Sequence, residues 1–418
     1  MSAISRRYGK NILCMIMAGG QGSRLSPLTR DRAKPAVHFG GTYRIIDFVL
    51  NNFINSGVHK VKILTQFKSD SLNKHISAAW SLNSSMGQYV DLVPAQMRTG
   101  NDWYKGTSDA IFQNINLITD ERPHLVAIFG GDHIYKMDMN QIFDFHYDHE
   151  AMLTIAAIPV PVAEAGEFGI IEVDSTNRMI GFEEKPKKNP KQIPGRPGWC
   201  LASMGNYIFT SKFLIRQLLE IHKNNPKATD FGHNILPFLY PKHPVYVYDF
   251  TSNVVPGERP NTQGYWRDVG TLDAFYEANM DICVQNPVFD LYNEAWPIRT
   301  YNWNMPPAKF YSSGIGEDKG HAINSVVSAG CIIGGDVINS VLSPGVRIQK
   351  GASVEGSVIF PDVTVGPGAK IRKAIIEKGL HIPAGFEIGY NMERDAAMFH
   401  LTESGIIVLS KDTLIKGN

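Results

Sequence analysis

The sequence predicts an α/β protein in which a Rossmann-like domain with a mostly parallel sheet is followed by a left-handed parallel β-helix. In the first two thirds of the chain, short apolar runs alternate with segments whose apolar residues recur at helical spacing. This alternation indicates a sheet covered by helices on both faces. Near the C-terminus, aliphatic residues recur every six positions, a period typical of stacked β-helix coils.

Buried strands are predicted where short, β-rich runs are flanked by polar or glycine positions. These runs are Ile12–Ala18, Val61–Thr65, Leu125–Phe129 and Leu153–Pro159. Helices are expected over Ile45–Ile54 and Ala110–Ile118, the second after the capping signal Thr107-Ser108-Asp109. Ligands bind such sheets at the carboxyl ends of the strands. The motifs "MAGG" and "IFGGDH" stand at two such ends, so we expect the functional site there.

The C-terminal part carries the six-residue period. Val346, Ala352 and Val358 are six apart, and Val363, Ala369 and Ile375 repeat that spacing. Ordinary hairpins rarely hold one period through different loops, so a β-helix is the favoured interpretation. The Pro-rich stretch 286–310 indicates an interdomain linker. We predict a first domain over 1–285, a linker over 286–320 and a β-helix over 321–418.

Composition excludes several classes of protein. The 418 residues are 43% hydrophobic and carry a formal net charge of +1, which leaves no electrostatic footprint for nucleic acid or an anionic membrane. No apolar run is long enough for a membrane span, and the basic N-terminus lacks a cleavage-like site. The four cysteines form no CxxC pair, which argues against a zinc site or disulfide framework. We expect a cytoplasmic protein.

A glycine-rich turn after the first strand is the clearest chemical signal. Gly19, Gly20 and Gly22 allow a tight turn whose N–H groups approach a phosphate closely. The pattern is neither a Rossmann fingerprint nor a Walker A motif, and by itself it also fits a plain strand-to-helix turn. Arg24 and Lys34 follow it. A forked guanidinium and an ammonium favour binding of a polyphosphate.

These residues form the pattern GGxGSRLxPLT followed by KPAV, which resembles the signature of sugar-1-phosphate nucleotidyltransferases. Further segments resemble the bacterial ADP-glucose pyrophosphorylase branch of that family and occur in order along nearly the whole chain. They are "AKPAVHFGG", "RIIDFVLNN", "QFKSDSL", "WYKGTSDAIFQN", "GGDHIYKMD", "FGIIEV", "FEEKP", "LASMGNYIF", "YWRDVGT" and "WPIRTY". The resemblance implies attack of glucose 1-phosphate on the α-phosphorus of ATP. It also implies a homotetramer that acts in bacterial glycogen synthesis.

The resemblance implies roles for individual residues. Arg24, Lys34 and Asp132 correspond to catalytic positions, and Asp132 and Asp268 to metal-binding aspartates, whose hard oxygens suit Mg²⁺. Nucleotide contacts fall on Gly19, Gly20, Gly22 and Gln96, and substrate contacts on Tyr104, Gly169, Glu184, Lys185, Ser203 and Asp230. His133 is expected to be structural, because the attacking sugar phosphate is already ionised and needs no general base.

The chain departs from its relatives at the effector site. Basic residues of both domains hold phosphorylated effectors in many bacterial members, and Arg32, His38 and Arg44 are the candidates here. Asp31 replaces a usual cation, and "DAAMFHLTESG" lacks the usual arginines. Each lost cation removes a charge-assisted hydrogen bond worth about 1.5–3 kcal/mol. We therefore expect effector control that is weak or differently tuned.

Three alternative functions remain. The chain could make another NDP-sugar, because the glycine-rich signature is shared. It could be a non-catalytic regulatory subunit, although such a subunit should have lost some of the phosphate and metal residues. The hexapeptide domain could be an acyltransferase, but His381 is the sole histidine within 325–389, which favours a structural role.

Overall fold

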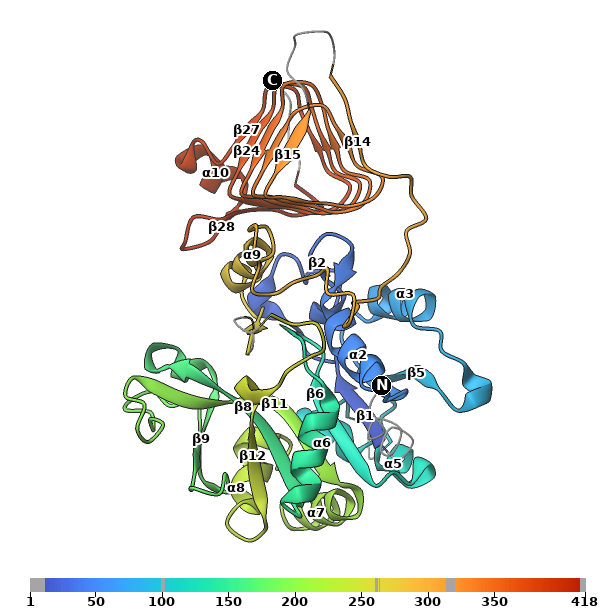
Figure 1. Ribbon diagram of the computed structural model, residues 1–418, viewed down its shortest axis with the longest axis vertical. Helices are drawn as coiled ribbons and strands as arrows, with labels where there is room; N and C mark the ends of the chain where they lie inside the picture. The colour runs from blue at the N-terminus through green and yellow to red at the C-terminus, as the bar shows by residue number, and fades with distance from the viewer. Residues whose placement is uncertain (1–11, 99–101, 260–261, 263, 313–319, 414–418) are drawn as a thin grey trace.

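The structure, a computed structural model, describes residues 12–98, 102–259, 262, 264–312 and 320–413. Figure 1 shows a sheet wrapped by helices and, beyond α9 (Leu272–Asp281) and β2 (His38–Phe39), a triangular prism of short strands. None of the helices in these described ranges combines the length and apolar character needed to cross a bilayer.

The first part is built on a mixed sheet with the strand order β10-β9-β11-β6-β1-β4-β5, to which β8 and β12 are joined through β11. The strands are β1 (Ile12–Met17), β4 (Lys60–Thr65), β5 (Tyr89–Pro94), β6 (Leu125–Gly130), β8 (Leu153–Pro161), β9 (Gly169–Val173), β10 (Met179–Glu184), β11 (Trp199–Thr210) and β12 (Val245–Asp249). Strands β5, β4, β1 and β6 run parallel, whereas β11 is antiparallel to β6. Met17 lies opposite Gly130, so the two glycine motifs emerge at one edge.

Side chains of β1 alternate between two hydrophobic cores, as period-two strand geometry requires. Cys14 and Ile16 belong to the core covered by α2 (Ile45–Asn55), α3 (Asp70–Ala79) and α6 (Met139–Asp148). Leu13 and Met15 belong to the opposite core, which four further helices cover. These are α4 (Thr107–Phe112), α5 (Ile115–Glu121), α7 (Ser211–Asn224) and α8 (Leu236–Leu239). Helices on both faces confirm the predicted layer architecture.

The helix expected over Ala110–Ile118 is two helices, α4 and α5, separated at Gln113 and Asn114. The Asn114 amide donates to the Ala110 carbonyl at 2.8 Å, and its backbone N–H donates to Ile111 at 3.0 Å. A side chain that competes for the i−4 carbonyl in this way interrupts the helical ladder. The helix also begins at Thr107, within the stretch expected to precede it.

The C-terminal part is a parallel β-helix with three faces, consistent with the left-handed form. The faces are β14-β17-β20-β23-β26, β15-β18-β21-β24-β27 and β16-β19-β22-β25-β29, and β28 pairs antiparallel with β29. In chain order, the strands of the first face are Lys309–Phe310, Ile332–Ile333, Arg347–Ile348, Thr364–Val365 and His381–Ile382. Those of the second face are His321–Ile323, Asp336–Ile338, Ser353–Glu355, Lys370–Arg372 and Glu387–Ile388. Those of the third face are Val326–Val327, Val341–Leu342, Val358–Ile359, Ala374–Ile376 and Ile407–Leu409, and β28 is His400–Leu401. All six residues that define the six-residue period are buried. The α10 helix (Met392–Met398) lies outside the prism.

The third face of the prism packs against the first part of the chain. Val341, Val358 and Ile375 share one apolar core with Phe39 and Phe275. Polar contacts add to it: the Tyr276 hydroxyl donates to the Gly356 carbonyl at 2.6 Å, and the Thr402 hydroxyl donates to Asp273 at 2.8 Å. Burial of a shared core is the main stabilising contribution to such an interface.

Candidate active site

The glycine turn after β1 packs directly against η3 (Lys34–Ala36), the short 3₁₀ turn that carries Lys34. Gly22 has a φ of 61°, a left-handed conformation that favours glycine. A Cβ atom there would lie 3.0 Å from the Cβ of Lys34. The Thr29 hydroxyl donates to the Gly22 carbonyl at 2.8 Å. The turn therefore brings Lys34 close to the edge of the sheet.

A cavity of about 260 Å³ opens beside this turn. Its lining comes from the ends of β1 and β4 and from the segment that leads into α4: Met17, Gly19, Gly20, Gln21, Leu64, Gln66, Tyr104, Lys105, Gly106, Thr107 and Ala110. The structure thus places the predicted residues Gly19, Gly20 and Tyr104 together. Apolar walls beside exposed backbone N–H groups suit a nucleotide base and its phosphates.

Gln66 is a cavity residue that the sequence reasoning missed. Its Oε1 accepts from the Tyr104 N–H at 2.7 Å and its Nε2 donates to the Tyr104 carbonyl at 3.3 Å. This paired contact fixes the backbone of Tyr104, whose hydroxyl accepts from Asn114 at 2.9 Å. The position of Gln66 could have indicated its role, because Gln66 stands just after the end of β4 and Gly19 stands just after the end of β1.

Lys34 joins two carboxylates that are far apart in the sequence. Its Nζ lies 3.0 Å from Oδ2 of Asp132 and 2.9 Å from Oδ1 of Asp268. Burial lowers the pKa of Lys34, but the two neighbouring aspartates outweigh that effect and raise it, so the side chain is an ammonium. Burial raises the pKa of Asp132, and the Lys34 charge overcomes this and brings it to about 2. The pairing of β7 (His133–Tyr135) with β13 (Trp266–Asp268) places the two aspartates side by side.

Asp132, His133 and Asp268 fit a divalent cation. Each offers one ligand atom, and these atoms all lie within 4.8 Å of one another. The carboxylate oxygens suit Mg²⁺, which takes few protein ligands and fills its shell with phosphate oxygens and water. The Asp132 side chain is 36% exposed, so substrate phosphates can reach it.

His133 lies beside the two aspartates. Its Nε2 is 3.6 Å from Asp132 Oδ1, and its ring packs edge-on against Trp266 at 5.0 Å. Its buried Nδ1 has no hydrogen-bond partner within the described part of the chain. The ring therefore combines a packing role with a position beside the candidate metal ligands Asp132 and Asp268.

A second cavity of about 210 Å³ shares Met17 and Thr107 with the first. It holds four predicted substrate residues, namely Gly169, Glu184, Ser203 and Asp230, and also Asp268. The remaining lining is Met17, Thr107, His133, Glu167, Phe168, Phe182, Met204, Gly205, Tyr207, Phe231, Gly232 and Trp266. Carboxylates and a hydroxyl among aromatic rings are the chemistry that binds a sugar.

Two glycines leave room for the Glu184 carboxylate in this second cavity. A Cβ at Gly169 would lie 2.9 Å from Glu184 Oε2, and a Cβ at Gly232 would lie 2.5 Å from it. Burial raises the pKa of Glu184, while His233 lowers it and Asp230 raises it further. Gly232 was not among the predicted site residues.

Asp230 is held rigidly at the mouth of the short π-helical turn Phe231–Ile235. Its side chain accepts from the His233 N–H at 3.0 Å and from the Thr107 hydroxyl at 3.0 Å. The Asn234 side chain accepts from the N–H groups of Thr229 and Asp230, both at 3.0 Å. The backbone of His233 and the side chain of Asn234 thus hold Asp230 in place.

Six of the predicted catalytic, nucleotide and substrate residues lie outside the linings of both cavities: Gly22, Lys34 and Asp132, whose positions are given above, and Arg24, Lys185 and Gln96. Arg24 is half exposed, and its guanidinium donates to Glu167 at 2.9 Å. Lys185 is exposed, and its backbone N–H donates to the Phe168 carbonyl at 3.0 Å. Gln96 is exposed and accepts from Arg98 at 3.2 Å. Lys185 directly follows the lining residue Glu184, and Arg24 lies three positions after the lining residue Gln21.

The candidate effector residues lie between the two domains. Arg32 and His38 are buried, and Arg32 donates to Glu377 of the β-helix at 2.9 Å. Burial, Arg44 and Arg32 hold the pKa of His38 well below its usual range. Burial and Arg32 lower the pKa of Arg44 to about 10, and its guanidinium donates to the Ala36 carbonyl at 3.0 Å. An internal carboxylate therefore already neutralises part of this basic cluster.

Comparisons with known proteins identify the family. The sequence model of the Nucleotidyl transferase family matches residues 13–285, and that of the GlmU-like, C-terminal hexapeptide family matches residues 306–409. A glucose-1-phosphate adenylyltransferase of Anaeromyxobacter sp. (strain Fw109-5) is 54% identical over 402 residues, which are 96% of this chain and 98% of that protein. One of Corynebacterium jeikeium (strain K411) is 48% identical over 97% of this chain and 99% of that protein.

The chain belongs to the glucose-1-phosphate adenylyltransferase family. The family resemblance read from the sequence is thereby confirmed, as is the order of a nucleotidyltransferase domain and a hexapeptide β-helix. The chain is therefore a nucleotidyltransferase, and the two adjoining cavities with the Lys34 cluster are its candidate active site.

Proposed function

We propose that this protein transfers the adenylyl group of ATP to glucose 1-phosphate, forming ADP-glucose and pyrophosphate with Mg²⁺. The observation that carries the proposal is the meeting of two cavities at one cationic and acidic cluster. The cavities share Met17 and Thr107, Asp268 lines the second, and Lys34 bridges Asp268 and Asp132. A displacement at phosphorus needs two substrates aligned on either side of such a cluster.

The cavity chemistry assigns one substrate to each cavity. The first takes the nucleotide, with the base against Leu64 and Ala110 and the phosphates on the Gly19–Gly20 backbone. The second takes the sugar, whose hydroxyls donate to Glu184 and Asp230. Lys185 supplies a cation for the sugar phosphate, and Gln96 contacts the adenine edge once the nucleotide is bound.

In the proposed reaction, a phosphate oxygen of glucose 1-phosphate forms a bond to the α-phosphorus of ATP. The bond from that phosphorus to the bridging oxygen breaks, and the electron pair leaves with pyrophosphate. Lys34 holds its ammonium beside the transferring group, and Arg24 exchanges Glu167 for a phosphate oxygen. Asp132 and Asp268 would hold Mg²⁺, which would neutralise charge on the substrate phosphates.

The proposal extends to assembly and control: a cytoplasmic homotetramer acting in glycogen synthesis, with weak or differently tuned effector control at Arg32, His38 and Arg44. Its support is the family resemblance together with the Arg32–Glu377 ion pair, which occupies one cation of the effector cluster. Sedimentation measures the assembly. Titration of activity with fructose 1,6-bisphosphate, fructose 6-phosphate, pyruvate and AMP tests control, and strong responses to the phosphorylated compounds would contradict it.

The experiment on the main proposal measures pyrophosphate release from the full chain with Mg²⁺ and glucose 1-phosphate. ATP is compared with UTP, dTTP and GTP, and Asp132→Ala serves as the inactive control. A preference for ATP that disappears in the variant supports adenylyl transfer. A preference for another nucleotide would replace the ADP-glucose assignment, and inactivity with every nucleotide would favour a regulatory subunit.

A further inference from the structure

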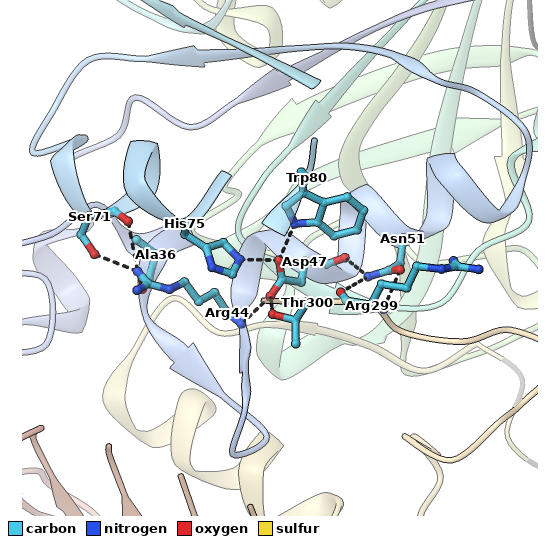
Figure 2. A network of polar contacts seen from close by, with 9 residues as sticks. All are labelled: Ala36, Arg44, Asp47, Asn51, Ser71, His75, Trp80, Arg299 and Thr300. Atoms are coloured by element: carbon cyan, nitrogen blue, oxygen red, sulfur yellow. Dashed lines mark hydrogen bonds and ion pairs between the residues drawn. The ribbon is translucent and has the colours of Figure 1, made fainter. Parts of the chain in front are cut away.

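A fully buried carboxylate, Asp47 on α2, gathers four hydrogen-bond donors from three segments of the chain: α3 with its C-cap, the N-cap of α2 and the linker (Figure 2). Its Oδ1 lies 2.6 Å from His75 Nε2 and accepts from the Trp80 indole at 2.8 Å. Its Oδ2 accepts from the Arg44 N–H at 2.8 Å and from the Thr300 hydroxyl at 2.7 Å. A buried carboxylate with its acceptors filled in this way fixes all of its partners in one arrangement.

One branch of the network leads to the turn that carries Lys34. The N–H of Arg44 caps α2 through Asp47, while its guanidinium donates to the Ala36 carbonyl at 3.0 Å and to the Ser71 hydroxyl at 2.7 Å. Ala36 closes the 3₁₀ turn that begins at Lys34. Arg44 therefore fixes the backbone two residues from the ammonium that bridges Asp132 and Asp268.

The other branch leads to the interdomain linker. Thr300 reaches Asp47 directly, and its neighbour Arg299 is tied to Asn51, one turn further along α2. The Asn51 amide donates to the Arg299 carbonyl and accepts from the Arg299 N–H, both at 2.8 Å. The polar face of α2 thus holds the linker in register just before it enters the β-helix at β14.

We propose that Asp47 is a positioning residue for Lys34, and that Thr300 couples the interdomain linker to it. The Asp47 carboxylate fixes the backbone of Arg44, and the Arg44 guanidinium fixes the η3 turn. That turn positions the Lys34 ammonium. A misplacement of a reacting or stabilising group by about 1 Å can cost about 10²-fold in rate. Displacement of the linker therefore changes phosphate binding without any linker residue touching a substrate. The part played by Lys34 rests on the function proposed above.

The test uses the full chain and a matched pair of substitutions. Thr300→Val removes the hydroxyl that donates to Asp47, whereas Thr300→Ser keeps it. Thr402→Val is the control, because Thr402 also donates to an aspartate across the domain interface, Asp273, at 2.8 Å, but its bond does not lead to η3. Each Thr→Val change replaces the hydroxyl with a methyl group of similar size, so each removes one hydrogen bond to a carboxylate.

The primary readout is ATP affinity measured calorimetrically in EDTA, and the second is kcat and KM with Mg²⁺. We expect Thr300→Val to weaken ATP binding and lower kcat/KM for ATP by roughly three- to thirtyfold. Thr300→Ser should recover most of this loss, and Thr402→Val should change neither value. In a Lys34→Gln background, Thr300→Val should have no further effect on ATP affinity, because both changes act through the same ammonium.

Equal behaviour of Thr300→Val and Thr402→Val would overturn the coupling, and so would additive losses with Lys34→Gln. Thermal unfolding of all variants separates these results from a general loss of stability. Asp47→Asn is a more drastic change and is therefore left out of the primary comparison. A wild-type protein that binds ATP but forms no ADP-glucose would contradict only the proposed function, since the binding measurement still tests the coupling.

Discussion

The substitution Gly232→Ala tests whether the second cavity is shaped around Glu184. Gly232 has no positive φ, so alanine is tolerated by the backbone and only space opposes it. The added Cβ would lie 2.5 Å from Glu184 Oε2 and 3.1 Å from its Cδ. Because such atoms need roughly 3.5 Å, the carboxylate must move by about 1 Å.

The size of the effect follows from the contact that is lost. A charge-assisted hydrogen bond contributes about 1.5–3 kcal/mol, which corresponds to roughly ten- to 150-fold in affinity. Glu184 is flexible enough to keep part of the bond, so we expect about a tenfold rise in KM for glucose 1-phosphate. ATP affinity in the first cavity should stay unchanged.

The assay is steady-state kinetics with each substrate varied in turn, together with a thermal unfolding midpoint. Gly166→Ala is the control, because its Cβ would meet only the Pro186 carbonyl at an ordinary 3.5 Å. If Gly232→Ala left the KM for glucose 1-phosphate at the wild-type value, the sugar would not contact Glu184 and the assignment of the second cavity would be wrong.

Three further predictions concern stability and control. Gly106→Ala places a Cβ 2.4 Å from the Thr229 carbonyl oxygen, so the backbone must move. We expect the free energy of unfolding, measured with a chemical denaturant, to fall by about 1–3 kcal/mol and ATP binding to weaken. Burial lowers the pKa of His146 from 6.5 to about 4. As the pH is lowered, the unfolded chain therefore takes up this proton before the folded chain does, and the free energy of unfolding falls by up to about 3 kcal/mol between pH 6.5 and 4. His146→Gln should flatten that part of the stability curve; an unchanged curve would refute the assignment. Glu377→Gln leaves buried Arg32 unpaired, which should cost about 3–5 kcal/mol, and inorganic phosphate should raise the melting temperature of this variant more than that of the wild type.

Local sequence patterns predicted the fold well because both parts of the chain are built from a repeated structural unit. The six-residue period marks positions that every coil of the β-helix must bury, and the alternation of strands and helices identifies the sheet. The split of the helix at Asn114 was not predictable, because it depends on a side chain competing with the backbone for the Ala110 carbonyl. The antiparallel placement of β11 likewise depends on contacts between distant segments.

The site was predicted where motifs carry it, and missed where only tertiary contacts do. Lys34, Asp132 and Asp268 were named from the family resemblance, and the structure brings them together. Gln66 stands directly after a strand end, but its contact with Tyr104, like the space that Gly232 leaves for Glu184, is visible only in the structure. The pairing of Arg32 with Glu377 joins residues 345 positions apart, which no local pattern indicates.

The most direct measurement of the central claim is single-turnover formation of ADP-glucose by the wild type and by Lys34→Gln, with both substrates saturating. If the Lys34–Asp132–Asp268 cluster aligns the transfer, the variant should form product about 10²–10³ times more slowly, while its melting temperature shows a folded protein. A folded Lys34→Gln variant that forms ADP-glucose at the wild-type rate would contradict the account.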